Sequence, residues 1–150
     1  MFYIAKEFTF ETAHRLLGHP KCGHLHGHSY RVIFELRSED LRDDSGEYTG
    51  MVRDYAELSH IKNFLDAMVD HKYIASGELI AADDPIIQAV LVAVGEEGLW
   101  RVPEMHRSTA ESMSQWFFQL FKERYPELVT VTVCETAKTS ATYHFDRGLR

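Results

Sequence analysis

Alternating apolar and polar residues predict two β-strands near the N-terminus, over residues 2–14 and 26–37. In the second strand, Val32, Phe34 and Leu36 fall on one face, because successive side chains of a strand point to opposite sides of a sheet. The residues between the two segments are rich in glycine and histidine. We therefore expect two strands that close around a polar loop.

The C-terminal part of the chain has a similar pattern. Residues 129–136 alternate valine with threonine and cysteine and predict a further long strand, and residues 141–145 can pair back onto it after a turn at 137–140. In the middle of the chain, an acidic stretch at 38–47 indicates a turn, and a short strand is expected at 48–53.

Two helices are predicted from apolar residues at helical spacing, each preceded by a capping box. In the first, Asp54 can cap the helix while Glu57 reaches back to the backbone. In the second, Ser108 and Glu111 occupy the equivalent positions. The apolar stripes are Leu58, Ile61, Leu65 and Met68 in the first helix, and Met113, Trp116, Phe117, Leu120 and Phe121 in the second.

Residues 75–107 are expected to form an insertion, as a lid or a surface excursion. Within it, Asp84 and Pro85 can begin a helix that runs through Val94 and ends at the glycines of 95–98. The order of strands and helices predicts a single α+β domain, with an antiparallel sheet and two main helices on one face.

Composition narrows the class of protein. With 45% hydrophobic and 26% charged residues, the chain of 150 residues has the balance of an ordinary globular domain. Its net charge of −7 argues against a nucleic-acid partner, because neutralising phosphates requires clustered lysine and arginine. The sequence has no apolar run of membrane length and no signal-peptide pattern, so we expect a cytoplasmic protein with no membrane partner.

The two cysteines lie in unlike settings and do not suggest a disulfide bond. Cys22 lies in the loop rich in glycine and histidine, whereas Cys134 lies in the predicted strand at 129–136 and is expected to pack there.

Three histidines provide the candidate chemistry. His14 ends the first predicted strand and shares the parity of its aromatic residues, and His26 and His28 share one face at the start of the second strand. If the strands close around the loop, the three imidazoles converge. Three neutral imidazoles with a fourth position left open form the ligand set of a catalytic zinc ion, so we expect Zn²⁺ here. A polar loop between two strands is the plain alternative.

These residues belong to motifs that resemble those of the 6-pyruvoyl tetrahydropterin synthases and the related 6-carboxy-5,6,7,8-tetrahydropterin synthases of queuosine biosynthesis. The most specific motif is C-G-x-L-H-G-H at 22–28, which follows F-x-F-E-x-A-H at 8–14. Shorter matches continue in the order of the family along nearly the whole chain, at 54–58, 70–71, 109–111 and 135–136.

The resemblance implies a role for each matching residue. The zinc ligands of the family fall on His14, His26 and His28. Its catalytic residues fall on Cys22, Asp70 and His71, its pterin-anchoring glutamate falls on Glu135, and Thr109 and Glu111 are secondary substrate contacts. The resemblance also implies the tunnelling fold, in which subunits join their sheets into a barrel, usually as a homohexamer built from two trimers with active sites between subunits.

The implied reaction is that of a zinc-dependent carbon–oxygen lyase acting on 7,8-dihydroneopterin triphosphate. Cys22 would take a proton as a thiolate, Asp70 would orient His71 as a proton relay, and Glu135 would hold the ring. We expect 6-carboxy-5,6,7,8-tetrahydropterin as the product, with loss of triphosphate and acetaldehyde. The alternatives are a 6-pyruvoyl tetrahydropterin synthase, a zinc- and pterin-binding homologue without turnover, and a zinc hydrolase.

Some of these residues have a purely structural interpretation. Asp70 and His71 could form a charged helix C-terminus, and capping alone would explain Glu111. Glu135 shares the parity of the strand valines and would point to the buried side, where an unpaired carboxylate is costly, so a ligand partner is favoured. The chain departs from the family pattern at 75–107 and at Ala110, which lacks the hydroxyl group often found at that position.

Overall fold

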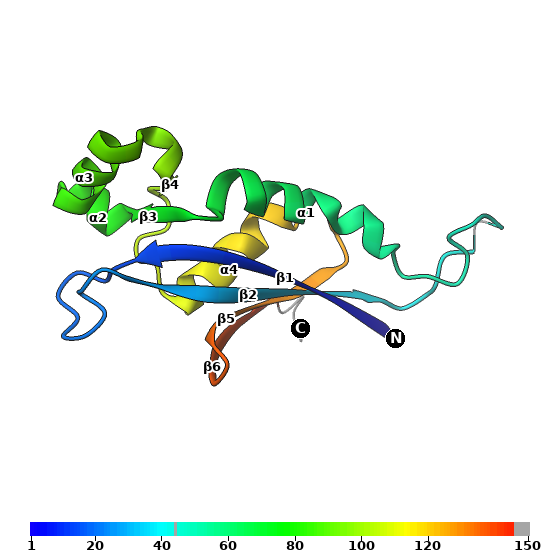
Figure 1. The fold of residues 1–150 in the computed structure, drawn as a ribbon. Coiled ribbons are helices and arrows are strands. Elements are labelled where there is room, and N and C mark those ends of the chain that lie inside the picture. The colour runs from blue at the N-terminus through cyan, green and yellow to red at the C-terminus, as the bar shows by residue number, and fades with distance from the viewer. Residues whose placement is uncertain (44, 146–150) are drawn as a thin grey trace.

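A mixed six-stranded sheet is the centre of the molecule. The computed structural model describes residues 1–43 and 45–145, and its strand order is β4-β3-β1-β2-β5-β6 (Figure 1). The strands are β1 (Phe2–His14), β2 (His26–Ser38), β3 (Lys72–Ser76), β4 (Leu99–Val102), β5 (Leu128–Thr136) and β6 (Thr139–His144). The helices are η1 (Tyr55–Leu58), α1 (Ser59–Phe64), η2 (Leu65–Val69), α2 (Gly77–Ala81), α3 (Pro85–Val94), η3 (Glu96–Gly98) and α4 (Ala110–Phe121). The predicted α+β class is confirmed, and α1 and α4 lie on one side of the sheet.

The predicted strands at the N-terminus are confirmed and form a long antiparallel pair. Its register runs from Phe2 opposite Ser38 to His14 opposite His26. The alternating apolar side chains of both strands are buried against the helices, as their two-residue period predicts. The buried members are Phe8, Phe10, Tyr30, Val32, Phe34 and Leu36.

Strands β1, β2, β5 and β6 are antiparallel, as expected, but the sheet also contains two parallel strands. β3 pairs with β1 at Thr12 and Ala13, and β4 pairs with β3 on its other side. The sequence pattern does not reveal them because β3 is buried on both faces and does not alternate between apolar and polar residues.

The prediction of a strand at 48–53 is wrong, because these residues form turns and irregular structure. Two backbone hydrogen bonds fold the segment back on Arg42: its N–H donates to the Met51 carbonyl, and its carbonyl accepts from the Gly50 N–H, both at 2.9 Å. This closes a local loop in place of a strand. Asp44, within the predicted acidic turn, lies outside the described residues.

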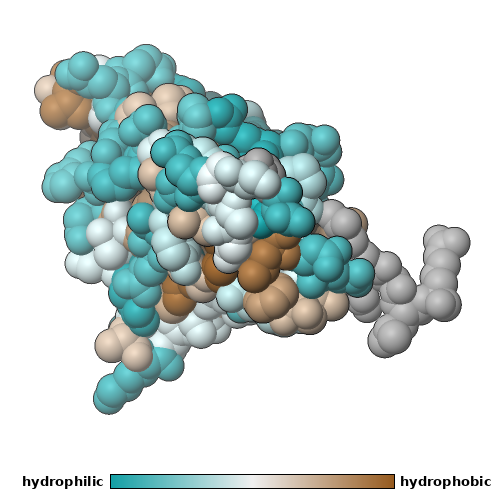
Figure 2. Space-filling model, turned by 90° about the vertical axis from the view of Figure 1, so that its right-hand side faces the viewer, coloured by the Kyte–Doolittle hydropathy of each residue, from teal (hydrophilic) through white to brown (hydrophobic). Residues whose placement is uncertain are grey.

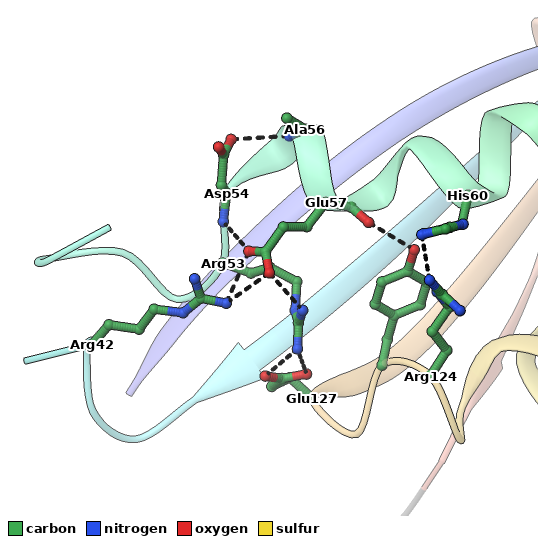
Figure 3. A network of polar contacts seen from close by, with 9 residues as sticks. Arg42, Arg53, Asp54, Ala56, Glu57, His60, Arg124 and Glu127 are labelled. Carbon is green, nitrogen blue, oxygen red and sulfur yellow. Dashed lines mark hydrogen bonds and ion pairs between the residues drawn. The ribbon is translucent and has the colours of Figure 1, made fainter. Parts of the chain in front are cut away.

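The capping box at Asp54 is confirmed. Its carboxylate accepts the Ala56 N–H at 2.9 Å, and the Glu57 carboxylate accepts the Asp54 N–H at 3.0 Å (Figure 3). The helix ends in a π-helical turn, η2, which changes the angular position of later residues, and Met68 is 49% exposed. The prediction that Met68 belongs to the buried stripe is therefore wrong.

In the second main helix, the cap is Thr109 and not Ser108. The Thr109 hydroxyl accepts the Ser112 N–H at 3.3 Å. Leu120 is 41% exposed, so it does not belong to the core as predicted, whereas the other members of its stripe are buried or partly buried against the sheet.

Residues 77–107 contain α2, α3, η3 and β4. The predicted helix beginning at Pro85 is confirmed, and Gly95 ends it with a φ of 78°, a left-handed conformation that favours glycine. The sequence predicts that Asp84 caps this helix, but its side chain does not do so. Its carboxylate instead contacts Tyr73 and Arg15. Apolar side chains of this segment and of β3 form a small second core, made of Tyr73, Ala75, Leu79, Ile87 and Leu99.

Among the helices of the described residues, none combines the length and the apolar character that a membrane crossing requires.

Glu57 also forms ion pairs with two arginines in the polar network of Figure 3, and substitution of Glu57 tests how much this network stabilises the fold. Its carboxylate pairs with Arg42 at 2.8 Å and with Arg53 at 3.2 Å, and Arg53 continues to Glu127 at 2.9 Å. Because Glu57→Ala leaves two partly buried guanidinium groups short of an acceptor, we expect the free energy of unfolding to fall by about 2 kcal/mol in urea denaturation.

The matched control is Asp66→Ala, which breaks the exposed ion pair of Asp66 with Lys62 on the same helical segment. Its cost should stay below about 0.5 kcal/mol. Equal losses in the two variants would contradict a specific role for the Glu57 network.

Candidate metal centre and its surroundings

The pairing of β1 and β2 brings the three predicted histidines together. His14 lies opposite His26, and His28 lies opposite Thr12 on the same face. One ligand atom from each imidazole falls within 4.8 Å of the others, and the ring centroids are 4.5 to 5.2 Å apart. This spacing fits a metal ion held by all three rings.

The glycine between His26 and His28 is required by this close approach of the strands. A Cβ atom on Gly27 would lie 2.8 Å from the Thr12 carbonyl oxygen, which is backbone and cannot move aside easily. The H-G-H motif therefore allows both histidines to reach the neighbourhood of His14.

Two of the imidazoles are oriented by backbone carbonyls. His14 Nδ1 lies 3.0 Å from the Ser108 carbonyl oxygen, and His26 Nδ1 lies 2.8 Å from the His24 carbonyl oxygen. Since a carbonyl can only accept, each Nδ1 carries the proton and each Nε2 has a free lone pair. Hydrogen bonds of this kind commonly fix the tautomer of metal-binding histidines.

The surroundings of His14 and His28 favour the neutral form of each imidazole. Burial, followed by the neighbouring His26, lowers the pKa of His14 from 6.5 to about 4, although the hydrogen bond to Ser108 acts in the opposite direction. Burial and His26 also lower the pKa of His28. Neutral imidazole is the form that binds a metal ion, so the lowered pKa values of these two residues favour metal binding.

Tyr30 forms the buried floor of the cluster. Its hydroxyl lies 3.3 Å from His14 Nε2, and its ring stacks on Phe10 with the centroids 5.0 Å apart. Burial raises the Tyr30 pKa, and the charges of Glu135 and Cys22 raise it further. Cys22 and Glu135 therefore lie close enough to the floor of the histidine cluster to act on it electrostatically.

Glu135 lies near the end of β5 and is partly buried. Burial raises its pKa, the nearby Glu111 raises it further, and His26 acts in the opposite direction. Its carboxylate thus lies between a second carboxylate and one of the histidines.

Asp70 and His71 form a hydrogen-bonded pair beyond the π-helical turn. His71 Nδ1 lies 2.8 Å from one Asp70 oxygen, and the other oxygen accepts the Glu11 N–H at 2.7 Å. Burial alone would raise the pKa of Asp70, but the hydrogen bonds from Glu11 and His71 lower it overall. His71 has a φ of 60°, and its N–H donates to the Glu11 carbonyl at 2.6 Å, so the backbone of β1 holds the pair in place.

An open hollow of about 460 Å³ has one residue of this pair and one histidine of the cluster in its lining. His28 and His71 both line it, together with Thr12, Lys72 and Tyr73. The His71 side chain is 78% exposed and is therefore accessible from this hollow.

Cys22 lies in the loop between β1 and β2, where it is partly buried, and both Cys22 and Cys134 are free thiols, as expected. The Cys22 N–H donates to His19 Nδ1 at 2.9 Å, and the Gly23 N–H donates to the His19 carbonyl at 2.9 Å. A Cβ atom on Gly23 would lie 2.5 Å from that carbonyl oxygen, which explains the glycine after the cysteine.

Sequence reasoning missed the role of Ser108. This residue is fully buried, and both its carbonyl and its hydroxyl contact His14, with the hydroxyl oxygen 3.2 Å from Nδ1. The neighbouring Thr109 caps α4, and Glu111 is exposed in the first turn of that helix. Since Ser108 is 94 positions from His14, no local pattern in the sequence could indicate the contact.

Comparison with known proteins is decisive for the family. The sequence model of the family described as 6-pyruvoyl tetrahydropterin synthase matches residues 3–146. The chain belongs to this family. Its members are lyase-type enzymes, and the sequence resemblance is thereby confirmed.

Curated relatives of this synthase family carry the name of one branch. A 6-carboxy-5,6,7,8-tetrahydropterin synthase of Synechocystis is 31% identical over 150 residues, covering 98% of this chain and 96% of the relative. Another protein of that name, from Haemophilus influenzae, is 38% identical over 125 residues, covering 81% of this chain and 83% of the relative.

Solved structures of similar proteins share the fold. An uncharacterized protein of Wolinella succinogenes is 27% identical with a TM-score of 0.78, and covers 97% of this chain and 98% of its own. The 6-pyruvoyl tetrahydropterin synthase of Caenorhabditis elegans is 24% identical with a TM-score of 0.66, and covers 97% of this chain and 96% of its own. The tunnelling fold expected of the subunit is therefore confirmed.

The lowered pKa of His14 predicts a pH dependence of stability for the protein kept free of metal by a chelator. Unfolding returns His14 to its ordinary pKa of 6.5, so the unfolded state binds a proton that the folded state binds only near pH 4. The free energy of unfolding should thus fall by about 3 kcal/mol as the pH falls from 6.5 to 4.

This dependence should be weaker in His14→Gln and unchanged in His144→Gln, which replaces an exposed histidine of β6. Urea denaturation at several pH values measures it. The same slope in wild type and His14→Gln would show that His14 is not the group responsible.

Proposed function

We propose that this protein is a zinc-dependent lyase that converts 7,8-dihydroneopterin triphosphate to 6-carboxy-5,6,7,8-tetrahydropterin, with loss of triphosphate and acetaldehyde. The observation that supports it most is the set of three converging imidazoles, two of which are oriented by carbonyls so that Nε2 is free. The names of the curated relatives support the 6-carboxy branch.

The donor set of His14, His26 and His28 fits zinc, because three imidazoles with no cysteine in the ligand set leave a fourth position for substrate. A zinc ion held there would act as a Lewis acid on the vicinal side-chain oxygens of the pterin and acidify the adjacent C–H. The residues of the chain then have to orient the substrate and move its protons.

Cys22 is proposed as the base that takes the side-chain proton as a thiolate. Its influence on the pKa of Tyr30, which lies against His14, supports a position beside the cluster. The partly buried setting of Cys22 would limit its exposure to solvent while leaving room for a substrate carbon.

Asp70 and His71 are proposed to return a proton to the substrate. Asp70 accepts the Nδ1 proton of His71, so the other ring nitrogen is free to exchange protons with a ligand in the hollow shared with His28.

Glu135 is proposed to hold the pterin ring through hydrogen bonds from its amino and N–H groups. A partly buried carboxylate with a raised pKa gains most from such donors, because they supply the hydrogen bonds that water would otherwise make. Thr109 and Glu111 would contribute secondary contacts, in addition to the capping role of Thr109.

Assembly into a homohexamer of two trimers is part of the proposal. Along β1, only Thr12 and Ala13 pair with β3, so the outer edge of residues 2–11 has no strand partner among the described residues. Figure 2 shows apolar surface on the face at the N-terminal end of β1. A hollow of about 450 Å³ at this end is lined by exposed apolar side chains, namely Phe2, Tyr3, Leu41, Met51 and Tyr55. An unpaired edge beside apolar surface favours pairing with another copy of the chain.

Sedimentation equilibrium tests this assembly. Six chains of 17.3 kDa predict a particle of about 104 kDa. Ala5→Pro should shift the distribution toward smaller species, because Ala5 shares the parity of Glu11, whose N–H and carbonyl both face away from β2, and proline removes an N–H from that free edge. A stable monomer at micromolar concentration would contradict the hexamer.

Two substitutions separate the proposed base from the proposed metal ligands. Cys22→Ala should reduce turnover to background and leave one bound zinc per chain, because Cys22 is not among the ligands. His26→Ala should lose both zinc and turnover. Metal content is measured by atomic emission, and Cys134→Ala is the control thiol, with activity expected near wild type. Near-normal turnover of Cys22→Ala would contradict the thiolate base.

The product identifies the branch of the family. Zinc-loaded protein is incubated with 7,8-dihydroneopterin triphosphate, and the pterin and any acetaldehyde are identified by mass spectrometry. The 6-carboxy product with acetaldehyde is expected. A 6-pyruvoyl product would favour the other synthase, and pterin binding without turnover would favour a homologue that has lost the activity.

A further inference from the structure

The loop that carries Cys22 is hydrogen-bonded at Leu17 to two side chains of residues 77–107. The Leu17 N–H donates to Glu78 Oε1 at 3.3 Å, and the Leu17 carbonyl accepts a short hydrogen bond from Arg107 Nη2. Glu78 and Arg107 also pair with each other, with Arg107 Nε 3.0 Å from Glu78 Oε2. Both backbone groups of one loop residue are thus bound by a single ion pair.

Packing reinforces this contact. The Leu17 side chain packs against the second core, to which Leu79 and Ile87 belong. The Glu78 side chain is only 11% exposed, so its hydrogen bonds are partly protected from water. In Figure 1, α2 and α3 lie at the same end of the sheet as the loop between β1 and β2.

The residue next to Leu17 connects the contact to Cys22. The Leu16 N–H donates to the Cys22 carbonyl at 2.7 Å, across the base of the loop. A shift of the backbone at Leu17 would therefore also move the Leu16 N–H, which is the hydrogen-bond donor to the Cys22 carbonyl.

A second contact holds the loop where it leaves β1. Arg15, the residue after the metal-cluster histidine His14, lies 3.4 Å from Asp84 Oδ1, and Asp84 Oδ2 accepts the Tyr73 hydroxyl at 2.7 Å. The Asp84 side chain is fully buried. This explains why Asp84 does not cap α3: its carboxylate is engaged by the loop and by β3.

We infer that Glu78 and Arg107 are positioning residues that set the place of Cys22 relative to the histidine cluster, with Asp84 holding the start of the same loop. The inference rests on the proposed role of Cys22. Residues 77–107 would then act as a support for the reactive loop, in addition to any covering role. A thiolate must lie within about 3.5 Å of the proton that it takes, and errors of about 1 Å can cost 100-fold in rate, so such support has a direct catalytic effect.

Amide hydrogen exchange on the metal-loaded protein tests the inference without relying on activity. In Glu78→Ala, the amides of Leu16 and Gly23 should exchange about tenfold faster, because their loop loses a charged, largely buried anchor. Amides of β2 and β5 should keep their wild-type exchange rates. Arg107→Gln breaks the other half of the contact and serves as the second variant if Glu78→Ala folds poorly.

Two further measurements follow the thiol itself. Alkylation of Cys22 by iodoacetamide, located by peptide mass spectrometry, should become about tenfold faster in Glu78→Ala as the loop opens. With the proposed substrate, kcat should fall about 10- to 100-fold while zinc content stays at the wild-type level.

Glu96→Ala is the matched control. It breaks the ion pair of Glu96 with Arg101 in the same segment, where both side chains are exposed, and the loop should behave as in wild type. Wild-type exchange at Leu16 and Gly23 together with wild-type Cys22 alkylation, in folded Glu78→Ala and Arg107→Gln, would overturn the inference. If wild type itself has no activity on the pterin, the proposed function fails, but the exchange and alkylation results still decide whether the contact holds the loop.

Discussion

The antiparallel register of β1 and β2 is the constraint on which the rest of the structure depends. It places His14 opposite His26 at the point where the two strands end, with His28 one pair further along the same face. Because a shift of one residue would turn every side chain to the other face, the apolar residues of both strands fix this register. Burial of Phe10, Val32 and Phe34 thus positions the histidines as effectively as any contact within the cluster.

Burial and mutual proximity make the protonated forms of His14 and His28 unfavourable in the histidine cluster. Burying imidazoles beside one another disfavours their charged forms, so a proton is costly there and a metal ion that takes a lone pair is favoured. The carbonyls of Ser108 and His24 use the opposite side of two rings, which leaves one direction for a ligand. A site of this kind requires contributions from β1, from β2 and from Ser108, two residues before α4, and the α+β fold brings these together.

The sequence was informative where structure repeats locally. The two-residue period of β1 and β2, the capping box at Asp54 and the H-G-H motif each depend on neighbours in the chain, and each was predicted. It was uninformative for β3, whose buried residues do not alternate, and for Met68, which a π-helical turn moves out of the stripe. It also gave no indication of the contact between Ser108 and His14, because these residues are 94 positions apart and no local pattern near Ser108 indicates His14.

The unpredicted strand β3 explains how a second set of polar groups comes to lie beside β1. Its parallel pairing with β1 at Thr12 brings the residues just before it, Asp70 and His71, against the backbone of Glu11. The π-helical turn and the left-handed conformation of His71 make the sharp change of direction that this pairing requires, and both are unusual features that tend to occur at functional sites. The same strand continues into residues 77–107, which return to contact the loop after His14. β3 therefore connects the Asp70–His71 pair, which lies against β1, with the segment that supports the Cys22 loop, and this gives a physical reason for extending the antiparallel sheet by two parallel strands.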